Sequence, residues 1–251
     1  MAYVTSQGLN IHYTVFGEGR PLLMHHGTML SAAAWAIDGY LDDLKDHRRL
    51  ILIDARGYGR GDKPHDIEEY VSSKLARDVI AVIDDLGLDA ITYWGYSLGA
   101  HVGYELVNIA PHRLDAMILG GGTPYPEDTR VPIEGDENDH VHVRARVLAS
   151  FGLTPETVPD KYRDVILAND FIAVRAALRD RPSAESALEK MAMPSLIYVG
   201  DQDPRLEPSK RTVAQLPNGK LVVLPGLDHL GALVMKDKVM PHAKQFLESL
   251  T

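Results

Sequence analysis

The order of apolar patterns along the chain predicts an α/β fold, with a mostly parallel sheet covered by helices on both faces. Two segments, 3–5 and 10–16, alternate as an exposed antiparallel hairpin does, around Gly8. After them, short apolar runs alternate with segments of helical period, which is typical of strand–helix–strand units with right-handed crossovers. Ligands of such sheets bind beyond the carboxyl ends of the strands, so we expect the functional residues there.

The expected core elements follow in regular alternation. Strands are predicted at 21–25, 50–53, 91–94, 114–119, 194–200 and 220–224. Helices are predicted at 31–44, 72–86, 207–216 and 233–250, with a further one that starts after residue 97 and ends before Pro111.

Composition narrows the class of protein. The chain has 251 residues, 45% of them hydrophobic and 24% charged, which suits one large α/β unit with a sizeable core. A net charge of −9 without a basic run argues against nucleic acid and anionic membrane as partners. The absence of cysteine excludes disulfides and thiolate chemistry. No transmembrane stretch or basic, apolar leader is present, so we expect a cytoplasmic protein.

The segment 124–191 differs from the rest of the chain. Residues 124–135 are rich in proline and charge, and 137–151, 159–179 and 183–191 then have helical patterns without intervening strands. We therefore expect an all-helical cap domain at 124–191, inserted into a core domain formed by 1–123 and 192–251. Insertions of this kind often cover an active site as a lid.

The first candidate functional residue is Ser97. It stands in Gly95-Tyr96-Ser97-Leu98-Gly99, between a strand pattern and a helix pattern. In that context Gly-x-Ser-x-Gly predicts a nucleophile elbow, a tight turn that exposes the serine at the carboxyl end of a strand. The glycines are needed because the strained turn brings strand and helix close together. The alternative is a glycine-rich turn that contains a serine by chance.

A serine hydroxyl needs a base and a group that orients this base. Asp201 and Asp203 follow the strand 194–200 and are the acid candidates. His229 follows the last strand on a loop and is the favoured base, whereas His242 lies in the last helix and is more typical of a solvated face. The order serine, acid, histidine is the one expected on such a sheet.

Backbone donors for an oxyanion are expected next to the serine and after the strand 21–25. Leu98 N–H follows the nucleophile directly. The second donor is expected from Thr28 or Met29, with Thr28 favoured because it follows Gly27. We interpret the His26 ring as a brace for this loop, and no nearby carboxylate or histidine has metal-ligand spacing.

The loop 54–64 superficially suggests a dinucleotide fingerprint, because Gly57-x-Gly59 follows a strand. The pattern fails at Asp62, and Pro64 blocks a helix that would receive phosphates. Asp54 and Arg56 are expected to tie this loop to the sheet.

Together these motifs resemble the α/β-hydrolase superfamily, in particular compact serine hydrolases with a helical cap. The resemblance covers essentially the whole chain. Its motifs are His26-Gly27, Asp54-x-Arg56-Gly57-x-Gly59, Gly95–Gly99, Gly200-x-x-Asp203 and Gly226-x-x-His229.

The resemblance implies site residues and a chemistry. It selects Asp203 over Asp201 as the acid, places the oxyanion hole at Thr28 and Leu98, and implies no metal or organic cofactor. A serine nucleophile argues against epoxide hydrolases and haloalkane dehalogenases. Leu230 stands where hydroxynitrile lyases have a lysine.

The expected function is hydrolysis of a carboxylic ester or lactone, a small-molecule substrate, through an acyl-enzyme on Ser97. Carbon–carbon bond hydrolases and perhydrolases use the same constellation, and a ligand receptor with little turnover is the alternative from another class. We expect a monomer or homodimer.

The cap is expected to supply the substrate pocket. Its candidate wall residues are Trp35, Tyr125, Phe151 and Tyr162. Arginines 144, 146 and 175 could contact a substrate carboxylate, although each is more typical of a solvated helix face.

Overall fold

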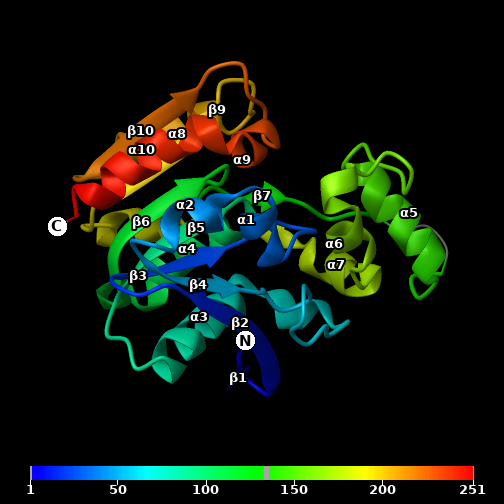
Figure 1. Cartoon of the computed structure of the whole chain (residues 1–251). Coiled ribbons are helices and arrows are strands. Elements are labelled where there is room, and N and C mark those ends of the chain that lie inside the picture. The colour runs from blue at the N-terminus through cyan, green and yellow to red at the C-terminus, as the bar shows by residue number, and fades with distance from the viewer. Residues whose placement is uncertain (1, 133–135, 251) are drawn as a thin grey trace.

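A computed structural model describes residues 2–132 and 136–250, which form a twisted sheet with helices on both faces (Figure 1). The eight strands lie in the order β1-β2-β4-β3-β5-β6-β9-β10. Strand β2 pairs antiparallel with β1 and β4, and the strands from β4 to β10 are parallel. The predicted fold class is therefore confirmed.

The strands of the sheet are short and mostly apolar. Their bounds are β1 Ala2–Ser6, β2 Leu9–Phe16, β3 Pro21–His25, β4 Arg49–Ile53, β5 Ile91–Tyr96, β6 Leu114–Gly120, β9 Ser195–Gly200 and β10 Gly219–Leu224. All residues of β5 and β9 are buried, because helices cover both faces of the sheet centre.

The core helices agree with the predicted pattern except where two long ones are broken. They are α1 Ala33–Ile37, α2 Tyr40–Leu44, α3 Ser72–Asp85, α4 Leu98–Ile109, α8 Leu206–Val213, α9 Gly231–Val234 and α10 Lys236–Glu248, with 3-10 turns η1 Ile67–Tyr70 and η2 Pro111–Arg113. The prediction of one helix over 31–44 is wrong, because Gly39 takes a left-handed φ of 80° between α1 and α2. The helix predicted at 233–250 is likewise interrupted, at Met235.

The segment between β6 and β9 forms a lobe beside the sheet, with α5, α6 and α7 grouped at one side in Figure 1. It contains β7 Glu127–Asp128, α5 His140–Ser150, η3 Asp160–Tyr162, α6 Arg163–Leu167, α7 Phe171–Ala177, β8 Asp180–Arg181 and η4 Glu185–Lys190. The Asp139 carboxylate caps the start of α5. The helix predicted over 159–179 is divided, because the Asp170 carboxylate caps a new helix, α7, within this range.

The prediction that this segment is all-helical is wrong in one respect. Strands β7 and β8 pair antiparallel, Glu127 with Arg181, in a small sheet of their own. Strands of two residues are too short to leave an alternating pattern in the sequence. The small sheet pairs residues 127–128 with residues 180–181, near the points where the segment leaves and rejoins the core.

Candidate active site

The turn between β5 and α4 has the geometry of a nucleophile elbow. Ser97 has a φ of 51° and a ψ of −107°, a strained conformation for a residue with a side chain. A Cβ on Gly95 would lie 2.3 Å from the Gly99 carbonyl oxygen, and a Cβ on Gly99 would lie 2.3 Å from the His25 carbonyl oxygen. Both glycines are therefore required by the close approach of strand and helix, as the sequence predicted.

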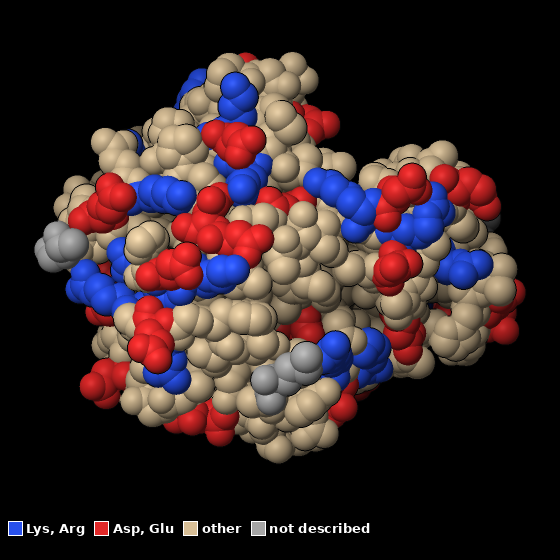
Figure 2. Space-filling model, viewed as in Figure 1, with Lys and Arg blue, Asp and Glu red and all other residues tan. Residues whose placement is uncertain are grey.

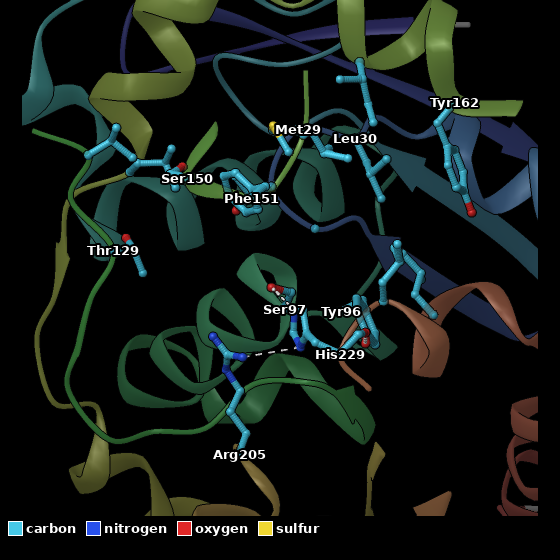
Figure 3. A pocket seen from close by; sticks show the side chains of 18 of the residues that line it. Met29, Leu30, Tyr96, Ser97, Thr129, Ser150, Phe151, Tyr162, Arg205 and His229 are labelled. Carbon is cyan, nitrogen blue, oxygen red and sulfur yellow. Dashed lines mark hydrogen bonds between the residues drawn. The ribbon is translucent and has the colours of Figure 1, made fainter. Parts of the chain in front are cut away.

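The structure brings Ser97, His229 and Asp203 together. The Ser97 Oγ lies 3.1 Å from His229 Nε2, and His229 Nδ1 lies 2.7 Å from an Asp203 carboxylate oxygen. Since Nδ1 faces a carboxylate, it carries the proton of the neutral imidazole, and Nε2 is then free to accept from the serine. Figure 3 shows the His229 ring beside Ser97 at the bottom of a cavity.

Backbone contacts hold the histidine loop in place. The Tyr96 hydroxyl donates to the His229 carbonyl oxygen, and the Gln202 N–H donates to the Leu227 carbonyl oxygen at 3.0 Å. Asp201, the other acid candidate, accepts from the Gly226 N–H at 2.8 Å. Asp201 thus joins the acid turn to the histidine loop, while Asp203 contacts the imidazole.

The environment of Asp203 favours its charged form. Burial raises the pKa of this carboxyl, but hydrogen bonds from His229 and from the Arg205 backbone N–H outweigh burial, so the pKa lies below its ordinary value. The carboxylate is therefore ionised at neutral pH and can orient the imidazole.

The loop after β3 lies against the elbow. A Cβ on Gly27 would lie 3.4 Å from the Ser97 Cβ, so the following Thr28 starts beside the nucleophile. The His26 ring donates through Nδ1 to the Gly27 carbonyl oxygen at 2.8 Å and accepts at Nε2 from the Ala55 N–H at 3.1 Å. This confirms that His26 braces the loop.

A cavity of about 560 Å³ opens above the serine. Its apolar lining comes from both the core and the inserted segment, and includes Met29, Leu30, Phe151, Leu153, Tyr162, Ile166, Leu178 and Leu233. In Figure 3 Met29, Leu30 and Phe151 lie on the side of the cavity opposite Arg205.

Two of the four predicted wall residues line this cavity and two do not. Phe151 and Tyr162 belong to the lining, as expected. Trp35 is a correction, because its ring is buried in the core against Tyr40 and Trp94. Tyr125 is another, because its ring packs under the Arg211 guanidinium, 4.2 Å from the ring centre.

The sequence did not predict the charged residues that line the cavity besides the triad, which are Asp128, Arg130, Arg181 and Arg205, nor Glu127, which contacts the last two. The Arg205 Nη1 atom lies 3.4 Å from both Asp203 and His229 Nδ1, and its other terminal nitrogen donates to Glu127. The Arg181 guanidinium donates to the second Glu127 oxygen at 3.2 Å and approaches the Thr28 hydroxyl at 3.4 Å. The dipeptides Asp180-Arg181 and Pro204-Arg205 carry no motif, so only the fold identifies them.

Figure 2 shows acidic and basic groups interspersed over the visible face, without a large basic area. Among residues 2–132 and 136–250, no three histidine, aspartate or glutamate side chains are placed to hold a metal ion. None of the helices in these ranges is long and apolar enough to cross a bilayer.

With this geometry established, similarity to known proteins identifies the family. A family model described as "alpha/beta hydrolase fold" matches residues 20–158. The chain therefore belongs to the α/β-hydrolase family.

Known relatives match most or all of the chain. The chain is 26% identical to a non-heme haloperoxidase of Rhodococcus erythropolis, over 99% of this chain and 100% of that protein. It is 27% identical to a 2-hydroxy-6-oxononadienedioate/2-hydroxy-6-oxononatrienedioate hydrolase of Pseudomonas putida, over 88% of this chain and 85% of that protein. An esterase of Rhodococcus sp. ECU1013 is 25% identical and superimposes with a TM-score of 0.80, over 99% of this chain and 98% of that one. Family and relatives together support hydrolase activity.

Proposed function

We propose that this protein is a serine hydrolase that cleaves a carboxylic ester or lactone, a small molecule, through an acyl-enzyme on Ser97. One observation supports this above all. The Ser97 hydroxyl, the His229 imidazole and the Asp203 carboxylate form an unbroken hydrogen-bonded chain at 3.1 and 2.7 Å. Such a chain activates a serine for attack on an acyl carbon.

The first half of the reaction forms the acyl-enzyme. His229 Nε2 takes the Ser97 proton while Oγ attacks the carbonyl carbon, and Asp203 stabilises the resulting imidazolium. The oxyanion is stabilised by the backbone N–H groups of Thr28 and Leu98; Leu98 N–H stands at the amino end of α4, where it has no partner within the helix. The tetrahedral intermediate then collapses and the imidazolium protonates the leaving alkoxide.

The second half returns the enzyme to its starting state. Water donates a proton to His229 as its oxygen attacks the acyl carbon, and Ser97 leaves with the proton from the imidazolium. We further propose that segment 124–191 acts as the cap, because Phe151, Leu153 and Tyr162 bring apolar surface over the serine.

The test is hydrolysis of a series of 4-nitrophenyl esters, from acetate to octanoate, by the wild type and by Ser97→Ala. We expect turnover in the wild type and a loss of at least about 1000-fold in the variant, because nucleophile and base act as a unit. Thr92→Ala removes a buried hydroxyl on β5, away from the cavity, and is the matched control.

The outcomes separate the alternatives. Equal rates in wild type and Ser97→Ala would contradict the proposal. A wild type that hydrolyses no ester or lactone, yet binds an acyl ligand tightly, would favour a receptor. Cleavage of a vinylogous diketone but of no ester would favour carbon–carbon hydrolysis.

A further inference from the structure

One wall of the cavity carries two arginines that face one carboxylate. Arg181 and Arg205 both line the cavity beside the serine, and each donates to a different oxygen of Glu127. The Arg181 side chain is only 8% exposed and that of Arg205 22%, whereas that of Glu127 is 35% exposed. Two guanidinium groups in a mostly apolar cavity therefore share the partly exposed Glu127, and Arg205 has the Asp203 carboxylate at 3.4 Å as a second, longer ion pair.

The remaining contacts of the two arginines are long. Arg181 approaches the Thr28 hydroxyl at 3.4 Å, and Arg205 approaches Asp203 at 3.4 Å. His229 Nδ1 cannot serve as an acceptor for Arg205, because the same nitrogen carries the proton donated to Asp203. A guanidinium has five N–H donors, so the two oxygens of Glu127 satisfy only part of the donors of this pair.

A buried cation with few acceptors is costly. Burial lowers the pKa of Arg181, an effect that the nearby Glu127 only opposes in part. The Asp203 carboxylate offsets part of the charge of Arg205 from 3.4 Å, whereas the ion pair of Arg181 is with Glu127. A second anion placed between the arginines would relieve this cost.

We propose that Arg181 and Arg205 form a carboxylate-binding subsite, and that the substrate is an ester or lactone that carries a free carboxylate. This inference rests on the proposed hydrolase function and specifies its substrate class. Planar guanidinium groups match the two oxygens of a carboxylate. Glu127, which contacts both guanidinium groups, stands in for the substrate carboxylate in the free enzyme and competes with it.

The wall opposite the arginines is apolar and suits the uncharged part of such a substrate. Met29, Leu30 and Phe151 lie across the cavity from Arg205 (Figure 3). A substrate would therefore place its apolar part against these side chains, its carbonyl carbon at Ser97, and its carboxylate at the arginines.

The experiment compares two esters that differ only in charge, mono(4-nitrophenyl) adipate and the 4-nitrophenyl ester of adipic acid monoamide. The wild type is expected to hydrolyse the anionic ester with a kcat/KM at least about tenfold higher. Arg181→Gln is expected to lower this ratio at least about tenfold, mainly through KM, since a hydrogen bond to a charged group is lost. Arg181→Lys is expected to retain part of the preference, because it keeps the positive charge but loses the planar guanidinium that can bind both carboxylate oxygens.

Two further variants sharpen the test. Arg211→Gln removes an exposed guanidinium of α8 that pairs with Glu185 outside the cavity, and is the matched control for charge. Glu127→Gln is expected to lower KM for the anionic ester, because the competing carboxylate is gone. A wild type that prefers the amide, or a ratio that Arg181→Gln leaves equal to that of Arg211→Gln, would overturn the subsite.

A binding measurement keeps this result separate from that of the proposed function. Adipate binding is measured by calorimetry at constant ionic strength, and labelling of Ser97 is measured with a fluorophosphonate. Adipate binding that Arg181→Gln weakens at least about tenfold supports the subsite even if no ester is hydrolysed; unchanged binding contradicts it. Failure of Ser97 to react with the fluorophosphonate contradicts the hydrolase proposal alone.

Discussion

The two walls of the cavity are held in place by different means. The core wall, which carries Ser97 and Thr28, stands on the ends of β5 and β3, strands with little or no exposed surface. The wall from segment 124–191 consists of short helices, and the Phe151 side chain that it presents is 45% exposed. Burial thus fixes the reacting groups, whereas the Phe151 side chain of the opposite wall is partly exposed.

Polar contacts show the same difference. Beneath the core wall, the Arg56 guanidinium is fully buried and donates two 2.6 Å hydrogen bonds to Asp78. At the boundary, the Tyr162 hydroxyl donates to Asp38 at 2.5 Å, and the Asn169 amide donates to the Met29 carbonyl oxygen at 2.8 Å. We infer that the chemistry depends on the stability of the core, and the shape of the cavity on a few bonds at the boundary.

The largest expected effect is loss of core stability in acid. Burial lowers the pKa of His25 to about 3 and that of His101 to about 3, and lowers the pKa of His26 as well. The folded protein keeps these rings neutral, while the unfolded chain binds protons below pH 6.5, so stability falls as pH drops from 6.5 toward 3. Between pH 7 and 5 this costs about 2 kcal/mol each for His25 and His101.

Urea unfolding at pH 7, 6 and 5 measures this effect. His101→Gln is expected to flatten the dependence by about 1.4 kcal/mol per pH unit below 6.5. His140→Gln, at the exposed start of α5, is the matched control. The same slope in both variants would show that the buried rings of the core do not set acid stability.

The next effect concerns the buried ion pair of the core. Asp78→Ala leaves the Arg56 guanidinium buried with only Glu69 beside it, and is expected to lower the free energy of unfolding by about 3–5 kcal/mol. In the inserted segment, Glu185→Ala removes the exposed partner of Arg211 and is expected to cost no more than about 1 kcal/mol. If urea unfolding showed an equal loss of unfolding free energy in both variants, ion pairs in the core and in the inserted segment would not differ in their contribution to stability.

A smaller effect than that of Asp78→Ala is expected at the boundary. Tyr162→Phe removes the hydroxyl that joins η3 to Asp38, and is expected to cost about 1–3 kcal/mol. Because this hydroxyl does not contact the triad, KM for the 4-nitrophenyl esters is expected to rise more than kcat falls.

Tyr125→Phe removes a hydroxyl of the same segment, one that accepts from Gln215 outside the cavity. It controls for loss of a hydroxyl as such. A Tyr162→Phe variant with the stability and KM of Tyr125→Phe would show that the Asp38 contact does not position this wall.

Much of the core followed from local patterns. Gly95 and Gly99 bracket Ser97 at a spacing typical of a strand, a tight turn and a helix, and the structure shows the steric reason, since a side chain at either position would clash. Strand boundaries agreed within one or two residues because apolar runs end where the chain leaves the sheet. Helix breaks at Gly39 and Met235 were missed, because apolar periodicity continues across a local change of backbone angle.

The sequence alone determined the family resemblance, the order serine, acid and histidine, and the position of each candidate at a strand end, because parallel strands collect their carboxyl ends at one edge. Only the tertiary structure decided which side chains line the cavity. Trp35 packs in the core and Tyr125 under Arg211, while Arg181 and Arg205, 24 positions apart, meet at Glu127. Contacts between distant segments depend on how the inserted segment folds back on the core. No local sequence pattern encodes which residues of the two segments then meet.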